Sequence, residues 1–146
     1  MLGSLARKLR AFGFDTTYYR AGDDRGLLAA AHEEGRVVLT SDRGIAAGSH
    51  RARVILVVGS SDSKRLSSLS EGAKSLGIGL FPGDSRCSLC NGALSRIERS
   101  KARGSVPDPV AARHRLFFRC ESCGRFYWRG GHWKKLRSLR GRLKTD

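Results

Sequence analysis

The chain has 146 residues, a formal net charge of +15 and a pI near 10.8, which favours a polyanionic partner because cationic side chains displace counterions from phosphate backbones. No stretch approaches the roughly 20 apolar residues of a membrane span. Arg7, Lys8 and Arg10 interrupt the only apolar stretch near the start, so a signal peptide is not expected either. We therefore expect a soluble, cytoplasmic protein with reduced thiols.

The first 80 residues carry alternating helix and strand patterns. Apolar residues at helical spacing predict three helices, over residues 2–12, 25–34 and 63–76. Runs of β-branched and apolar residues predict four strands, over residues 16–20, 37–40, 53–58 and 77–83. Strands that are apolar on both faces and alternate with helices are typical of α/β proteins, so we expect a parallel sheet with flanking helices.

Charge divides the chain into two parts. Residues 1–80 hold 12 Lys+Arg and 8 Asp+Glu, whereas residues 81–146 hold 16 and 5, a net charge of +11. We expect three regions: an α/β domain over residues 1–82, a metal-binding ribbon over residues 83–133 and a basic tail over residues 134–146.

The tail is rich in Lys and Arg, with no acidic residue before Asp146. Leu136, Leu139 and Leu143 fall at helical spacing, so an anionic membrane surface is a rival to RNA as its partner. We favour RNA, because three leucines make a thin apolar stripe and basic tails beside metal ribbons are common in nucleic-acid binders. A solvated chain end is the plainest alternative.

All four cysteines lie in two Cys-x-x-Cys pairs, Cys87/Cys90 and Cys120/Cys123. Two such pairs can close a tetrahedral site of four sulfurs around one zinc ion. Glycine follows each pair, as Gly92 and Gly124, and lets the backbone turn so that amide N–H groups point at the sulfurs. A site with four thiolate ligands is closed, so we expect this zinc to be structural.

Other uses of the cysteines are less well supported. Two disulfides would require an oxidising compartment, and a thioredoxin-like redox pair would leave the second Cys-x-x-Cys unexplained. Iron remains an alternative to zinc, because the sequence from Cys120 to Tyr127 resembles a rubredoxin knuckle. The insert of 29 residues between the pairs, residues 91–119, is long for a ribbon loop, and a helix is expected near residues 110–115.

Acidic residues follow two of the predicted strands. Asp23 and Asp24 come after strand 16–20, and Asp42 comes after strand 37–40. Ligands of parallel α/β sheets bind at the carboxyl ends of the strands, and converging carboxylates suit Mg²⁺ or Mn²⁺. Each aspartate also has a plainer interpretation as a helix N-cap.

Several segments together resemble one known family, the Mut-seven C-terminal family, which is similar to PIN-domain ribonucleases with an appended zinc ribbon. The segments that carry the resemblance are Met1–Arg10, Gly13–Thr16, Asp23-Asp24, Gly35–Arg43, Tyr127-Trp128 and Gly131–Trp133. The resemblance extends to about residue 133. It implies a PIN-like α/β fold, RNA as substrate and a divalent-metal site, whose residues by motif position are Asp23 or Asp24, and Asp42.

One part of the family pattern is missing. Members of the family begin with a short apolar strand ending in an aspartate, and this chain starts just after that point. The resemblance implies that this aspartate is a central metal ligand. We expect the true start to lie upstream of Met1; the alternative is a truncated form with an impaired site.

The predicted function is metal-dependent hydrolysis of RNA phosphodiester bonds, with Asp23, Asp24 and Asp42 as catalytic residues and the ribbon and tail binding RNA. A non-catalytic RNA-binding or ribosome-associated zinc-ribbon protein is the alternative, and a toxin of the PIN class is a third. Aromatic residues of the ribbon could stack bases or cover its core. His132 is expected in packing or RNA contact. The sequence does not predict the oligomeric state.

Overall fold

The computed structural model describes residues 2–20, 22–48 and 51–143, and the chain forms two compact units. Unit 1 comprises Met1–Leu5, Tyr18–Phe81 and Gly141–Asp146, and unit 2 comprises Ala6–Thr17 and Pro82–Arg140. Each unit is therefore built from segments that are far apart in the sequence. Within the described part of the chain, no helix has the length and apolar character needed to cross a membrane.

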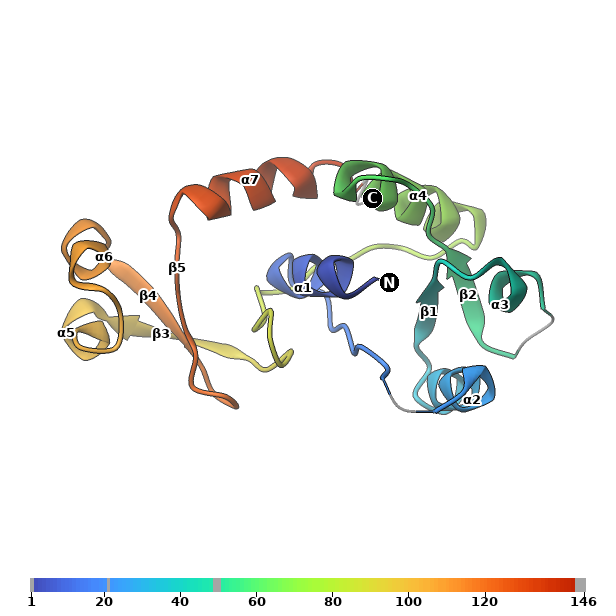
Figure 1. The fold of residues 1–146 in the computed structure, drawn as a ribbon, viewed down its shortest axis with the longest axis horizontal. Helices are drawn as coiled ribbons and strands as arrows, with labels where there is room; N and C mark the ends of the chain where they lie inside the picture. Colours follow the sequence, from blue (N-terminus) through green and yellow to red (C-terminus); the bar gives the residue numbers. More distant parts are fainter. Residues whose placement is uncertain (1, 21, 49–50, 144–146) are drawn as a thin grey trace. The chain divides into compact units, whose positions relative to one another are not determined.

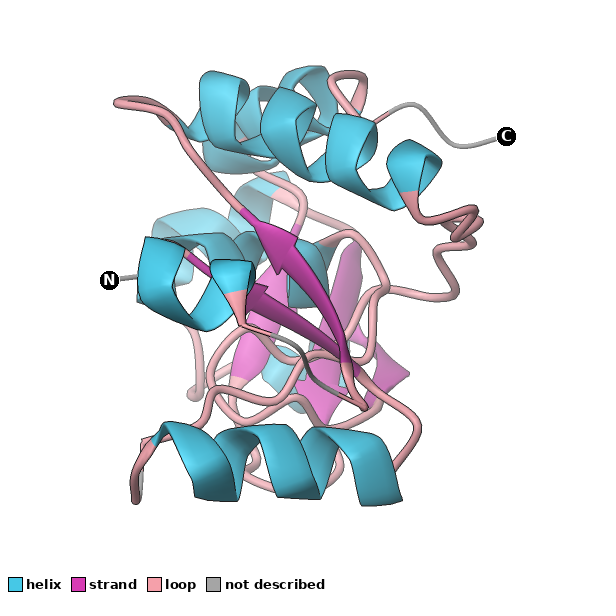
Figure 2. Ribbon diagram, turned by 90° about the vertical axis from the view of Figure 1, so that its right-hand side faces the viewer, coloured by secondary structure: helices cyan, strands magenta, loops and turns pink. Residues whose placement is uncertain are grey.

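Unit 1 is built on two parallel strands, β1 (Val37–Thr40) and β2 (Arg53–Leu56), which pair from Val37↔Arg53 to Thr40↔Leu56. Three helices pack against them (Figures 1 and 2): α2 (Asp24–Glu33), α3 (Arg43–Ala47) and α4 (Asp62–Ser75). Because α3 connects the strands, they form a parallel crossover. The prediction of a mixed α/β fold with a parallel sheet and flanking helices is confirmed.

The core of unit 1 lies between β2 and α4. Its fully buried side chains include Ile55, Val57 and Leu66. At Gly72 the helix lies so close to the strand that an added Cβ would be 2.4 Å from Ile55 Cγ2. Glycine is therefore required by packing in the middle of a helix, where its flexibility otherwise costs about 1 kcal/mol relative to Ala.

Unit 2 contains a three-stranded antiparallel sheet in the order β3 (Leu94–Glu98), β4 (Leu116–Cys120) and β5 (Phe126–Trp128). Two short helices lie between β3 and β4, α5 (Arg99–Ala102) and α6 (Asp108–Arg113). Apolar side chains of the insert form a small core with the sheet. Its buried members are Ala102, Val106, Ala111 and Phe117, and the partly buried side chains packed against them are Ile97, Val110, Phe126 and Trp128. The long insert is thus a folded element, and its second helix starts two residues before the predicted 110–115.

Two further helices are α1 (Gly3–Ala11) and α7 (Gly131–Arg140). The first matches the prediction for residues 2–12. The second shows that the region from residue 134 to residue 140 is helical, with its basic side chains Lys134, Lys135, Arg137 and Arg140.

Two predicted strands, 16–20 and 77–83, are wrong, because the described residues in both segments have no strand partner. The polar backbone groups of Thr16 bind side chains instead: its N–H donates to Asn91 Oδ1 and its carbonyl accepts from Arg10 Nε. The Ile78 N–H donates to the carbonyl of Ala73 at the end of α4, so this segment continues the helix cap. Strand 53–58 ends at Leu56, because the Val58 N–H donates to the Ser68 hydroxyl.

Candidate functional site

The four cysteines form a cluster in unit 2, and their sulfur atoms all lie within 4.8 Å of one another. Cys87 Sγ is 3.6 Å from Cys123 Sγ, and Cys90 Sγ is 3.4 Å from Cys120 Sγ. Four sulfurs arranged tetrahedrally at about 2.3 Å from a zinc ion would be separated by about 3.8 Å. The cluster could therefore hold zinc. Each of the two short distances links a sulfur of the first Cys-x-x-Cys pair to a sulfur of the second.

The two Cys-x-x-Cys turns share one backbone pattern. In the first, the Cys87 N–H donates to the Gly92 carbonyl at 2.9 Å and the Asn91 N–H donates to the Cys87 carbonyl at 2.8 Å. In the second, the Cys120 N–H donates to the Arg125 carbonyl at 2.8 Å and the Gly124 N–H to the Cys120 carbonyl at 3.0 Å. The equivalent residues Asn91 and Gly124 have φ of 70° and 75°, a conformation that Gly and Asn adopt most readily.

Hydrogen bonds to the sulfurs support the site from outside. The N–H of Gly92 donates to Cys90 Sγ and the N–H of Cys123 donates to Cys120 Sγ, both at 3.4 Å. The Tyr127 hydroxyl lies 2.9 Å from Cys87 Sγ. Such contacts orient metal ligands and favour the thiolate that binds the metal.

The same contacts shift the pKa values of three of the thiols. Burial works against the thiolate of Cys87, but hydrogen bonds from Tyr127 and the backbone outweigh it and lower the pKa of Cys87. Burial likewise opposes ionisation of Cys120, and hydrogen bonds from the Cys123 and Ser122 backbone lower its pKa to about 6. At Cys90 the Gly92 amide favours the thiolate, yet the neighbouring sulfurs, Cys120 first, raise the pKa to about 12. A cation would remove this repulsion between sulfurs.

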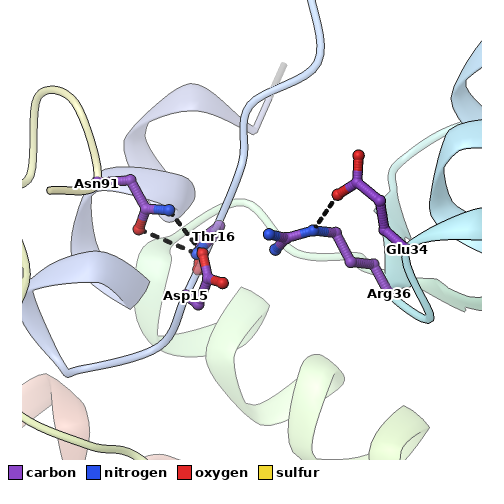
Figure 3. Close-up of polar contacts among 5 residues, drawn as sticks. All are labelled: Asp15, Thr16, Glu34, Arg36 and Asn91. Carbon is purple, nitrogen blue, oxygen red and sulfur yellow. Dashed lines mark hydrogen bonds and ion pairs between the residues drawn. The ribbon is translucent and has the colours of Figure 1, made fainter.

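The first Cys-x-x-Cys turn is fastened to the segment 6–17 of the same unit. Arg10 is buried, with 7% of the residue exposed, and its guanidinium donates to the carbonyl oxygens of Thr16 at 2.7 Å and of Ser88 and Leu89 at 3.0 Å. Asn91 adds a second attachment (Figure 3), because its side chain donates to Asp15 at 2.6 Å and accepts from the Thr16 N–H at 3.1 Å. No local sequence pattern predicts the hydrogen bonds that Arg10 and Asn91 make between the turn and this segment, which join residues more than 70 positions apart.

The three aspartates proposed for catalysis lie in unit 1, at helix starts. Asp23 is the N-cap of α2 and accepts from the Gly26 N–H at 2.9 Å, and Asp24 is the first residue of that helix. Asp42 is the N-cap of α3, where its Oδ1 accepts from the N–H groups of Gly44 at 2.7 Å and Ile45 at 3.2 Å. The capping interpretation is therefore confirmed for Asp23 and Asp42.

Capping leaves part of each carboxylate exposed. The second oxygen of Asp42, Oδ2, makes no hydrogen bond within the described residues, and the side chain lies two residues beyond the carboxyl end of β1. Within the same residues, the cysteine cluster is a group of three or more side chains that could share one metal position, and no acidic group does so. At the other end of α2, Glu34 is held in an exposed ion pair with Arg36, at 2.6 Å (Figure 3).

The other candidate residues are the aromatic side chains near the end of the ribbon and His132; some of them pack in unit 2 and His132 is exposed. Tyr127 faces the sulfur of Cys87, whereas Phe126 and Trp128 pack against the small core of unit 2, as the core-covering interpretation predicted. Arg129 lies over the ring of Trp133 at 5.5 Å. His132 is exposed in α7 and is not a member of the cysteine cluster.

Comparison with known proteins identifies one family. Residues 1–139 match the family described as the Mut7-C RNAse domain, so the match covers nearly the whole chain. Neither the curated proteins nor the solved structures contain a match. The chain belongs to the Mut7-C RNAse domain family, as the sequence resemblance predicted, and this membership indicates a ribonuclease-type function.

Proposed function

We propose that the protein is a metal-dependent ribonuclease that hydrolyses RNA phosphodiester bonds, with Asp42 as a metal ligand and Asp23 and Asp24 as the further candidates. Within the described residues the three carboxylates do not converge on one metal position, so the proposal rests on Asp42. The observation that carries this proposal is that Asp42 Oδ2 makes no hydrogen bond in the part of the chain that the structure describes, in a member of a ribonuclease-domain family. The carboxyl end of a parallel strand is the usual ligand-binding edge of such sheets.

A bound Mg²⁺ or Mn²⁺ ion would activate a water molecule and neutralise charge on the phosphate. The chain's own contribution is to hold the Asp42 carboxylate in place. Two backbone N–H groups fix Oδ1, and the Thr40 hydroxyl accepts a hydrogen bond from the Asp42 N–H at 3.0 Å. The side chain is thus oriented with one oxygen anchored and the other available to a cation.

In this proposal the cysteine cluster holds a structural zinc ion, and the basic surface of unit 2 holds the RNA. Residues 82–140 contain 14 Lys+Arg and 4 Asp+Glu, a balance that attracts the phosphate backbone. Four thiolates complete the coordination of zinc, so no position is left for a substrate.

The experiment that tests the proposal separates capping from catalysis at Asp42. Asparagine is as good an N-cap as aspartate but lacks the charge, whereas alanine removes both. We expect Asp42→Asn to abolish Mg²⁺- or Mn²⁺-dependent cleavage of single-stranded RNA while its unfolding midpoint stays near that of the wild type. Glu71→Gln, the same charge change at an exposed position of α4, is the control. Cleavage at the wild-type rate by Asp42→Asn would overturn the assignment.

A second candidate is a non-catalytic RNA-binding protein. The observation that favours it is that Asp23 and Asp42 already serve as N-caps and need no other role. It predicts that the wild type and every aspartate variant bind RNA equally and that none cleaves it in Mg²⁺ or Mn²⁺.

A further inference from the structure

A hollow of about 500 Å³ lies in unit 2 beside the second Cys-x-x-Cys turn. Its lining comes from both turns, from β5 and from the insert: Leu89, Cys123, Gly124, Arg125, Phe126, Trp128, Ser105 and Pro107. Its volume falls within the range of about 300–1,000 Å³ that is typical of small-ligand sites. None of its lining residues is acidic.

The aromatic side of the hollow is rigid. Side chains alternate along a strand, so Phe126 and Trp128 lie on one face of β5 while Tyr127 lies on the other, at the sulfur of Cys87. Phe126 and Trp128 also pack against the core that contains the fully buried Phe117. Both rings are only partly buried. The Arg119 guanidinium lies over the Phe126 ring, 5.7 Å from its centroid, whereas no guanidinium of the described residues lies over Trp128.

The rim is also held in place. Leu89 is 49% exposed, and its carbonyl oxygen accepts a hydrogen bond from Arg10. The turn of the insert is fixed by the N–H groups of Ser105 and Val106, which both donate to the Ala102 carbonyl. The backbone carbonyl of Arg125 accepts from the Cys120 N–H, but its side chain is exposed and makes no polar contact within the described residues. A guanidinium without a polar partner in the described residues therefore borders the same hollow as the two aromatic residues.

We propose that this hollow binds one unpaired base of single-stranded RNA, with Trp128 as the stacking surface, Phe126 beside it and Arg125 at the adjoining phosphate. The inference rests on RNA being the substrate of the proposed function and assigns one nucleotide position to the ribbon. Stacking on aromatic side chains beside a cationic groove is how proteins hold single strands without reading their sequence. A basic unit without acidic lining favours this occupant over a neutral peptide, and duplex RNA does not offer free base faces.

Tryptophan fluorescence provides a direct test, because the chain has 2 tryptophans and Trp133→Phe leaves Trp128 as the only one. The full chain, loaded with zinc and without added Mg²⁺, is titrated with a short oligouridylate. We expect saturable quenching of Trp128 by the stacked base. Inorganic polyphosphate and polyglutamate, which carry charge but no base, should leave the signal unchanged. Quenching by polyglutamate equal to that by RNA would overturn the proposal in favour of an acidic peptide.

Variants at the rim test the site without disturbing the core. Arg125→Ala should weaken oligouridylate binding. Because one phosphate contact is lost, the plot of log K against log salt concentration should become less steep by about one unit. Ser105→Phe should block the hollow and weaken binding about tenfold, the loss expected for one stacked base. Arg113→Ala, an equal charge change at an exposed position of α6 outside the lining, is the control. Equal losses for Arg113→Ala and Arg125→Ala would contradict a specific site.

The two proposals fail in different ways. RNA cleavage without quenching of Trp128 would refute the base site and leave the ribonuclease proposal intact. Quenching that requires Arg125, in a chain that cleaves no RNA, would support the base site and refute the ribonuclease proposal.

Discussion

Arg10 and Ser88 are 78 residues apart in the sequence, yet Arg10 Nη1 donates to the Ser88 carbonyl oxygen at 3.0 Å. The same guanidinium serves the carbonyls of Leu89 and Thr16, so a single buried charge joins the segment 6–17 to the first Cys-x-x-Cys turn. A planar group with several donors suits this arrangement, and lysine cannot reproduce it.

Replacement of Arg10 should therefore destabilise the metal-binding unit. We expect Arg10→Ala to cost about 3 kcal/mol of unfolding free energy, because three carbonyls lose a charged donor, and Arg10→Lys to recover only part of that loss. Arg7→Ala, an exposed neighbour on the same helix, should change stability by less than about 0.5 kcal/mol. Urea unfolding of the zinc-loaded chain measures all three. Equal midpoints for the Arg7 and Arg10 variants would contradict this role.

The cysteine cluster should bind one zinc ion per chain with all four thiols. Removal of the metal by a chelator should unfold the ribbon, because the two turns meet at the sulfurs and the core of unit 2 is small. Near-ultraviolet circular dichroism follows this loss, and elemental analysis distinguishes zinc from iron. Thiol titration of the denatured, metal-free protein should give four free cysteines without reductant, whereas none would indicate two disulfides.

Tyr127 should strengthen metal binding without being a ligand. Its hydroxyl lies 2.9 Å from Cys87 Sγ, and loss of such a supporting hydrogen bond typically lowers metal affinity about 10- to 100-fold. We expect Tyr127→Phe to weaken zinc binding by about tenfold in a competition with a chromophoric chelator. Tyr18→Phe, in unit 1, is the matched control and should have no effect.

Asp23 and Asp24 should differ in their contribution to stability although they are adjacent. Asp23 caps α2 through the Gly26 N–H, so Asp23→Ala should lower the free energy of unfolding by about 1 kcal/mol. Asp24 contributes only the favourable interaction of its charge with the first turn of the helix, so Asp24→Ala should lower the free energy of unfolding by roughly 0.3 kcal/mol. Thermal unfolding measures both. If Asp24→Ala abolishes RNA cleavage with its stability unchanged, the effect on activity cannot be attributed to the helix.

Local patterns in the sequence predicted the helices well, and non-local contacts explain the failures. The periodicity of residues 63–76 is a property of the segment itself, and α4 spans Asp62–Ser75. The β-branched segment 16–20 forms no strand, because Thr16 finds its partners in Arg10 and Asn91. The cysteine cluster was predictable because spacing within each pair carries the signal.

The hydrogen bonds that hold the first Cys-x-x-Cys turn were less predictable, because they are non-local. Asn91 follows Cys90 directly, and asparagine tolerates its positive φ, so the sequence held a local hint of the turn. Its contacts with Asp15 and Thr16 connect residues 75 and 76 positions apart, and no local pattern encodes them. Partners of this kind appear only when the chain is folded.

Gly72 offers the sharpest test of packing in unit 1. Glycine to alanine inside a helix ordinarily stabilises by about 1 kcal/mol, but here the new Cβ would lie 2.4 Å from Ile55 Cγ2. We expect Gly72→Ala to destabilise by about 1–3 kcal/mol, because overpacking forces β2 and α4 apart. In an Ile55→Ala background the same substitution should cost less, since the opposing methyl group is gone, and a double-mutant cycle of unfolding free energies measures the difference. Additive effects of the two substitutions would mean that α4 and β2 do not meet at these residues.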